Sequence, residues 1–155
     1  MTTEKLAYRK AELSDLPKIV KMLADDFLGK SREEFSLPLL PSYIEAFEEI
    51  NRDSNNLLAV VDLPNHKTIG TIQLTFIPGI AMKGAKRLLI EAIRVDDSFL
   101  NQGIGTKMME WAIEEGMKKG CKIAQLTSNQ LRQDAHRFYE KLGFEATHYG
   151  FKRYL

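Results

Sequence analysis

The chain has almost no cysteine, no long apolar run and no excess of one charge. A single cysteine, Cys121, among 155 residues excludes a disulfide within the chain and is typical of the reducing cytoplasm. The apolar runs are short, with Leu57 to Val61 among the longest, so no membrane-spanning segment is expected. The net charge is +1, which predicts no general attraction to nucleic acid or to an anionic membrane.

The composition is that of an ordinary globular protein, with 44% apolar and 28% charged residues. A chain of 155 residues is long enough for one hydrophobic core, and no repeat, low-complexity tract or linker divides it. We therefore expect one domain over residues 1–155, located in the cytoplasm.

Hydrophobic periodicity and turn residues predict a mixed succession of strands and helices. In chain order the predicted elements are a strand at 6–12, a helix from Ser14 to about Phe27, a helix at 42–52, strands at 57–62, 67–77 and 87–95, a helix at 106–119, a strand at 122–127, a helix at 132–142 and one or two short strands within 144–155. Three consecutive strands with short turns favour an antiparallel meander. The strand–helix–strand unit from Arg87 to Thr127 favours a parallel pair. The expected fold class is α/β, a mixed sheet with helices on both sides.

The most informative segment is a short glycine turn, Asn101-Gln102-Gly103-Ile104-Gly105-Thr106, between a predicted strand and a predicted helix. The first backbone N–H groups of a helix lack partners and carry partial positive charge, so this turn is suited to an anion such as a phosphate. A dinucleotide-binding reading fails because the third glycine position is Met108. A nucleotide P-loop reading fails because Gly105-Thr106-Lys107 is not Gly-Lys-Ser/Thr.

A second block strengthens this interpretation. Asn129 follows the next predicted strand, and the helix after it reads Ala135-His136-Arg137-Phe138-Tyr139-Glu140-Lys141-Leu142-Gly143-Phe144. With Leu100-Asn101-Gln102-Gly103-Ile104-Gly105, the two blocks resemble the two main motifs of the GNAT superfamily of acyl-CoA N-acyltransferases, in the same order. The resemblance implies a central sheet of six to seven strands flanked by about four helices. The chain departs from the pattern at Leu100, where the family usually has Arg or Gln.

The resemblance further implies that acetyl-CoA is the co-substrate, with no metal. In the family the pyrophosphate lies on the amides of the glycine turn, and the pantetheine arm pairs with the backbone of the preceding strand. A bulge in that strand separates two parallel strands and opens the acetyl slot. Carried over to this chain, the cofactor-binding residues are Ile93, Arg94, Val95, Gln102, Gly103, Ile104, Gly105, Thr106 and Asn129. Asn129 is equally well explained as a turn or helix-capping residue.

Two residues are candidates for acid–base chemistry. Tyr139 is placed to donate a hydrogen bond or proton to the departing thiolate, and its alternative role is that of a core tyrosine on an amphipathic helix. Glu91 is a carboxylate within an apolar strand, a position where charged residues are uncommon unless they have a partner or a function. The family often has a base at this place. The alternatives are an ion pair with Arg94 or Lys86, or a recognition charge in the substrate cleft.

These features predict an N-acetyltransferase acting on a primary amine of a small molecule or peptide, by direct attack in a ternary complex. The alternative is a non-catalytic acyl-CoA-binding sensor. Arg94 is a candidate for binding an anionic substrate group, although a salt bridge is its more usual role. The aromatic residues near the C-terminus either line the acceptor pocket or form a dimer interface; they are Tyr149, Phe151 and Tyr154. The family resemblance implies a homodimer. The identity of the amine is not encoded in any motif.

Overall fold

The computed structural model describes residues 5–65 and 67–155, and it is built around a mixed sheet. In the described residues the sheet has five strands in the order β1-β2-β3-β4-β5. The strands are β1 (Ala7–Lys10), β2 (Asn56–Asp62), β3 (Thr68–Ile77), β4 (Arg87–Val95) and β5 (Ile123–Gln125). Neighbours from β1 to β4 are antiparallel, and β5 runs parallel to β4. The predicted meander and parallel crossover are both confirmed.

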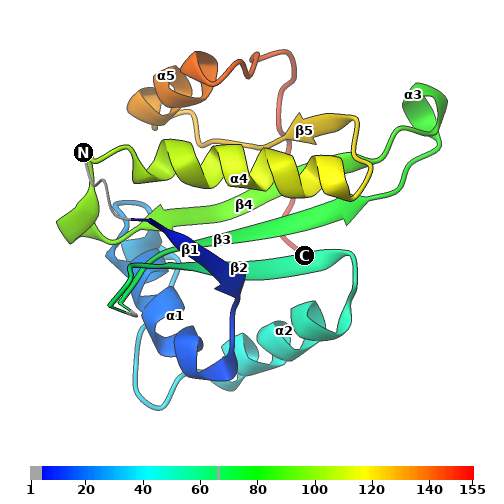
Figure 1. The fold of residues 1–155 in the computed structure, drawn as a ribbon. Helices are drawn as coiled ribbons and strands as arrows, with labels where there is room; N and C mark the ends of the chain where they lie inside the picture. Colours follow the sequence, from blue (N-terminus) through cyan, green and yellow to red (C-terminus); the bar gives the residue numbers. More distant parts are fainter. Residues whose placement is uncertain (1–4, 66) are drawn as a thin grey trace.

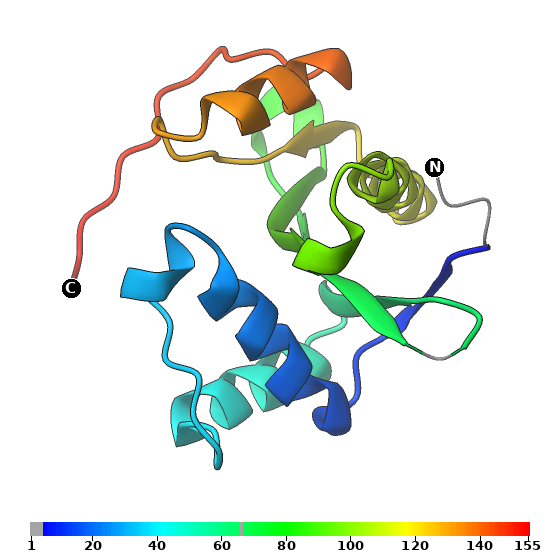
Figure 2. The same ribbon diagram turned by 90° about the vertical axis from the view of Figure 1, so that its left-hand side faces the viewer.

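Helices cover both faces of the sheet, as Figures 1 and 2 show. They are α1 (Leu16–Asp25), α2 (Pro41–Arg52), the one-turn α3 (Ala81–Gly84), α4 (Ile104–Lys118) and α5 (Gln133–Lys141). Helices α1 and α2 lie on one face and α4 on the other, while α5 lies beyond the β5 edge. None of the helices in the described residues is long and apolar enough to cross a membrane.

Strand β2 shows why both faces are covered. Ala59 and Val61 pack into the core beneath α4, whereas Leu58 and Val60 pack into a second core beneath α1 and α2. Successive side chains of a strand point to opposite faces, so a continuous apolar run needs a helical layer on each side. The unbroken Leu-Leu-Ala-Val-Val sequence therefore specifies a central strand of a three-layer molecule.

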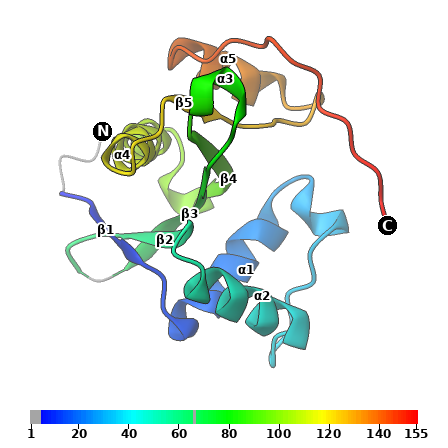
Figure 3. The ribbon, with the colours of Figure 1, turned by 90° about the vertical axis from the view of Figure 1, so that its right-hand side faces the viewer.

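The C-terminal segment corrects the expected strand count of six to seven. Residues 144–155 form no strand, and Tyr149, Phe151 and Tyr154 are 86%, 92% and 92% exposed. Strand β5 has three residues, after which the chain turns away into α5, so β5 offers no long edge for a sixth strand. Figure 3 shows the tail leaving α5 and running along the outside of the molecule.

Helix α4 begins at Ile104, two residues earlier than the predicted start at Thr106. Gly103 therefore precedes the helix directly, and Gly105 lies in its first turn. Helical spacing predicts that Met109, Ala112, Ile113 and Met117 face inward. Met108 and Met109 are fully buried, whereas Met117 is 69% exposed. Gly116 is the residue of this turn that packs on Leu88 of β4, and Met117, the next residue round the helix, points away from the sheet.

We expect Met108→Ala to lower the free energy of unfolding by about 3 kcal/mol, because it removes a buried side chain and leaves a cavity. Met117→Ala on the same helix is the control and should change it by less than about 0.5 kcal/mol. Urea unfolding followed by circular dichroism measures both. Equal effects of the two substitutions would contradict the assigned helix face.

Candidate active site

The site is opened by an irregularity in β4. Between Thr71 and Gln73 of β3 the register advances two residues, while on β4 it advances three, from Arg94 to Glu91. The extra residue is accompanied by a left-handed backbone at Ala92, with φ of 50°. This is a β-bulge, the feature that the family resemblance predicts in this strand.

The bulge changes which side chains of β4 face which layer. Before it, Leu88 and Ile90 pack beneath α4; after it, Ile93 and Val95 do so. Residues that face α4 are two apart on each side of the bulge, but Ile90 and Ile93 are three apart across it. The reason is that one residue is added to a strand whose side chains alternate with a period of two. Arg94 is thereby turned to the face that carries α1.

Pairing between β4 and β5 ends just before the bulge. The last paired residues are Leu89 and Gln125, although β4 continues to Val95. From Ile90 onward, the β5 side of β4 has no strand partner in the described residues. This stretch of backbone is thus open to an extended ligand beside Ile93, Arg94 and Val95, the residues assigned to the pantetheine, although the Ile93 carbonyl already accepts a hydrogen bond from the Arg94 guanidinium, 2.6 Å.

The glycine turn lies directly beyond this opening. Gly103 has φ of 76° and precedes the first residue of α4, and the first helical bond of the turn runs from the Lys107 amide to the Gly103 carbonyl, 3.2 Å. The amides of Ile104, Gly105 and Thr106 therefore precede the helical ladder. They are the donors that the sequence assigned to a pyrophosphate.

A hollow of about 410 Å³ lies over this turn. It is lined by Val95, Phe99, Leu100, Asn101, Gly103, Ile104, Gly105, Thr106 and Phe138. A Cβ added to Gly103 would meet nothing within 4 Å, so this backbone is open to a ligand on that side. Apolar walls beside a row of helix-terminal amides suit a molecule with an apolar arm and a phosphate group, and the side chain of Leu100 adds an apolar wall where the family has a polar one.

Tyr139 lies on α5, next to Phe138, which lines the hollow over the glycine turn. It packs edge-on against Phe138 and Phe144, with ring centroids 5.2 and 6.1 Å away. Burial raises the pKa of its hydroxyl, and the nearby charges of Arg94 and Arg132 oppose that rise. The phenol therefore remains protonated at neutral pH and serves as a hydrogen-bond donor.

Glu91 lies on the exposed part of β4, opposite Gln73 and on the same face as Arg94. Within the described residues it forms no ion pair with Arg94 or Lys86, which were its alternative partners. The recognition-charge and base interpretations of this carboxylate both remain compatible with its position.

Asn129 has a structural role in the loop before α5. Its side-chain oxygen accepts a hydrogen bond from the Leu131 amide, 2.9 Å, and its carbonyl oxygen accepts one from the Arg132 amide, also 2.9 Å. The turn-forming alternative for this residue is thus observed, and one side-chain atom is already engaged.

Three arginines from separate elements surround one carboxylate, that of Asp26 just after α1. We call Arg94, Arg132 and Arg32 the arginine cluster. Arg132 binds Asp26 through two nitrogens, one at 2.9 Å, and the terminal nitrogens of Arg94 and Arg32 lie 3.3 and 4.0 Å away. Burial opposes ionisation of Asp26, but the Arg132 hydrogen bond and the charges of Arg94 and Arg132 outweigh it and hold its pKa at about 2. The charge of Asp26 is therefore present at neutral pH.

The sequence alone does not predict the arginine cluster. Asp26 and Arg132 are 106 residues apart, and no motif spacing connects them. Of the three arginines only Arg94 carried a signal, as a charged residue between Ile93 and Val95.

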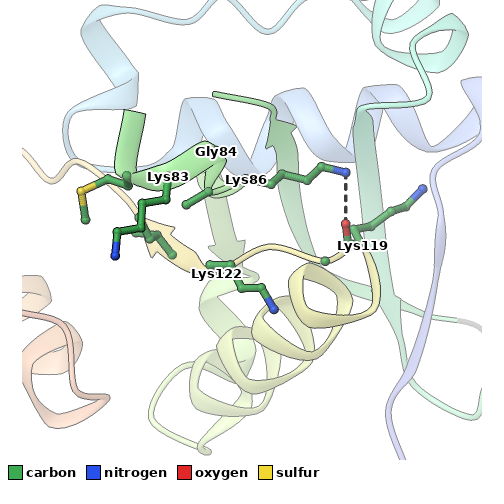
Figure 4. A pocket seen from close by; sticks show the side chains of 9 residues that line it. Lys83, Gly84, Lys86, Lys119 and Lys122 are labelled. Carbon is green, nitrogen blue, oxygen red and sulfur yellow. Dashed lines mark hydrogen bonds between the residues drawn. The ribbon is translucent and has the colours of Figure 1, made fainter. Parts of the chain in front are cut away.

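A second hollow, of about 550 Å³, lies at the other end of α4. It is lined in part by Lys83, Lys86, Lys119 and Lys122. Figure 4 shows that these ammonium groups point in different directions, and that of Lys86 donates to the Lys119 carbonyl, 3.1 Å. They do not converge on one ligand. Over the described ranges, no group of three or more His, Cys, Asp or Glu is placed to hold a metal.

The bulge, the opened strand pair and the glycine turn are features of the family that the sequence resembles, and a comparison with known families tests that resemblance. The acetyltransferase (GNAT) family matches residues 18–144. The chain belongs to the GNAT acetyltransferase family. GNAT acetyltransferases act on amine acceptors and use acetyl-CoA.

Known structures share its whole fold. It is 42% identical to a transcriptional regulator from Bacillus halodurans C-125, over 97% of this chain and 100% of that one, with a TM-score of 0.93. A glucosamine-6-phosphate N-acetyltransferase from Arabidopsis thaliana has a TM-score of 0.78 at 22% identity, over 97% and 99% of the two chains. That second likeness shows the fold alone.

A shorter match is to an aminoalkylphosphonate N-acetyltransferase of Salmonella typhimurium. The GNAT acetyltransferase is 39% identical to it over 54 residues, a segment that spans 35% of this chain and 35% of that relative. About a third of the relative's length is thus aligned.

We expect Gly103→Ala in this GNAT acetyltransferase to weaken acetyl-CoA binding about tenfold or more, because the added methyl would stand at the amide row that holds the phosphates. Isothermal titration with acetyl-CoA measures the effect.

Gly120→Ala is the matched control, since Gly120 also has a positive φ, 79°, with open space around it, at the far end of α4. Both substitutions should cost about 1 kcal/mol of stability from the left-handed backbone. Equal affinities of the two variants would remove the turn from the binding site.

Proposed function

We propose that this acetyltransferase transfers the acetyl group of acetyl-CoA to a primary amine of a small molecule or peptide, by direct attack in a ternary complex. The observation that carries the proposal is the end of β4–β5 pairing at Leu89, directly before the Ala92 bulge and beside the glycine turn. This arrangement offers free strand edge, apolar walls and helix-terminal amides to one elongated ligand. We further propose that residues 1–155 act as one such domain.

The chain holds acetyl-CoA mainly through backbone groups. The amides from Gln102 to Thr106 hold the pyrophosphate, and the backbone of Ile93 to Val95 holds the pantetheine and polarises the carbonyl by hydrogen bonding. The side-chain amide of Asn129 is a further contact. What the bound molecule supplies is an activated thioester with a thiolate leaving group.

Tyr139 acts on the leaving group. A thiol has a pKa of about 8.5 and a phenol one of about 10, so the phenol donates a strong hydrogen bond to the developing thiolate before any proton is transferred. The burial that raises the pKa of Tyr139 keeps this donor protonated.

Glu91 acts on the amine. An alkylamine with a pKa of about 10.4 must lose a proton before it attacks, which costs about 4.6 kcal/mol at pH 7, whereas an α-amine near 7.8 costs about 1 kcal/mol. In this proposal the exposed Glu91 carboxylate on β4 takes that proton, directly or through water, and its exposure supports the assignment.

The exposed aromatic tail supports a homodimer more than a pocket wall. Tyr149, Phe151 and Tyr154 are almost fully exposed, and exposed apolar groups of this size are commonly covered by a partner. We propose that a second copy covers them.

Tyr139→Phe tests the proposed function. We expect thiol release from acetyl-CoA with at least one class of amine, among amino acids, aminoalkyl acids, polyamines, aminoglycosides and N-terminal peptides. The variant should lower kcat by about 100-fold or more while acetyl-CoA affinity is retained.

Tyr149→Phe removes a hydroxyl from an exposed tail tyrosine and should leave kcat unchanged. Acetyl-CoA binding without turnover on any amine would favour the sensor alternative, with which the description of the Bacillus halodurans relative as a transcriptional regulator agrees.

Glu91→Gln should lower kcat/KM most at pH values below the pKa of the acceptor, where the amine must be deprotonated on the enzyme, and least above it. The pH profile of kcat/KM, with Glu114→Gln on the exposed face of α4 as the control, measures this. A profile of unchanged shape would take Glu91 out of the mechanism.

A further inference from the structure

The arginine cluster carries more positive charge than the protein neutralises. Arg94, Arg132 and Arg32 contact a single carboxylate, that of Asp26, so three positive charges meet one negative charge. The side chains of Arg94 and Arg132 are 21% and 24% exposed, which limits how much water compensates for the excess. A net positive, partly buried cluster attracts an anion.

Asp26 has little capacity left for these arginines. Its Oδ2 atom accepts hydrogen bonds from the backbone amides of Leu28 and Gly29 at 3.2 and 3.1 Å, in addition to the bond from Arg132. Its Oδ1 atom accepts from Arg132 at 2.9 Å. A carboxylate offers about four lone-pair sites, so most donors of Arg94 and Arg32 need another acceptor.

Arg94 shows this shortage directly. One terminal nitrogen donates to the Ile93 carbonyl at 2.6 Å, and the other lies 3.3 Å from Asp26. Its Nε is buried without a hydrogen-bond partner, one of two such side-chain atoms in the described residues, together with Ser128 Oγ. A buried guanidinium N–H without a partner is destabilising, so Arg94 has fewer acceptors around it than donors.

The cluster lies where an acceptor would bind. Arg94 follows the bulge on the same face as Glu91, and its charge acts on the hydroxyl of Tyr139. Its neighbours Ile93 and Val95 are the residues assigned to the pantetheine. An anion bound at the cluster would therefore lie beside the stretch of β4 assigned to the pantetheine.

We propose that the acceptor is a small amine that also carries a carboxylate or a phosphonate or phosphate group, and that Arg94 and Arg32 bind this group beside Asp26. The inference rests on the function proposed above and adds the chemical class of its substrate. Guanidinium forks match both kinds of oxyanion, and the two are distinguished by the arms of the experiment.

The first measurement compares acceptors of equal length at saturating acetyl-CoA. β-Alanine and 2-aminoethylphosphonate each carry an anion, whereas ethanolamine and propylamine do not. We expect kcat/KM for the preferred anionic amine to exceed that for the neutral amines by about 100-fold. Equal values for all four would overturn the inference and leave the proposed function standing.

The second measurement uses variants. Arg94→Gln should lower kcat/KM for the anionic amine about 30-fold through KM, and Arg32→Ala, at the most exposed position of the cluster, about fivefold. Arg94→Lys, which keeps the charge but not the fork, should fall between wild type and Arg94→Gln. Arg137→Ala removes an exposed arginine from α5 and is the control. A preference that survives in Arg94→Gln and Arg32→Ala would overturn the inference.

Binding without chemistry separates this inference from the proposed function. Ethylphosphonate and propionate carry the anion but no amine, and isothermal titration should show binding to wild type and about fivefold weaker binding to Arg32→Ala. Arg32→Ala keeps this test valid if Arg94→Gln does not fold, which circular dichroism will show. Arginine-dependent binding without turnover on any amine would support the anion site and count against the proposed function. Absence of such binding would count against the anion site whatever the turnover.

Discussion

One extra residue in β4 determines the geometry of the site. Ala92 adopts a left-handed backbone, which costs an alanine about 1 kcal/mol. The cost is offset by pairing with β3 on both sides of the bulge, which continues from Gly70–Val95 to Ile77–Arg87. The bulge turns Arg94 toward α1, keeps Ile93 and Val95 in the core, and coincides with the end of β4–β5 pairing. The open strand edge and the contact of Arg94 with Asp26 both adjoin this bulge.

Tight packing of α4 holds the glycine turn against this strand. A Cβ on Gly116 would lie 2.8 Å from a methyl of Leu88, and one on Gly70 would lie 3.0 Å from the sulfur of Met108, so helix and sheet approach as closely as glycine permits. Interiors packed to this density transmit position accurately. The amides at the start of α4 are therefore fixed relative to the open edge of β4, which a ligand spanning both requires.

Charged contacts tie the acceptor side to the same strand. Asp26 connects the end of α1 to β4 and to the start of α5 through Arg94 and Arg132. Lys18 of α1 pairs with Asp96, just after β4, with the pKa of Asp96 lowered chiefly by that hydrogen bond. Elsewhere, Arg9 joins Asp15 and Asp62 at the start of α1 and so has a purely structural role. Of these three sets of ion pairs, the one around Asp26 has more cations than carboxylates, so it alone keeps an excess of positive charge.

Most of the helices and strands, and the resemblance to a family, could be read from the sequence. The continuous apolar run of β2 required helices on both faces, and the two blocks between Leu100 and Phe144 resembled the GNAT motifs, a resemblance that the family match confirmed. These features are local, so hydrophobic periodicity and motif spacing encode them. Only the tertiary structure decided the rest. It left residues 144–155 unpaired, placed Met117 in solvent, engaged Asn129 in a turn, and brought Asp26 to Arg94 and Arg132. Each outcome depends on which segments meet in space, because strand edges, buried faces and ion pairs need partners that lie far apart in the chain.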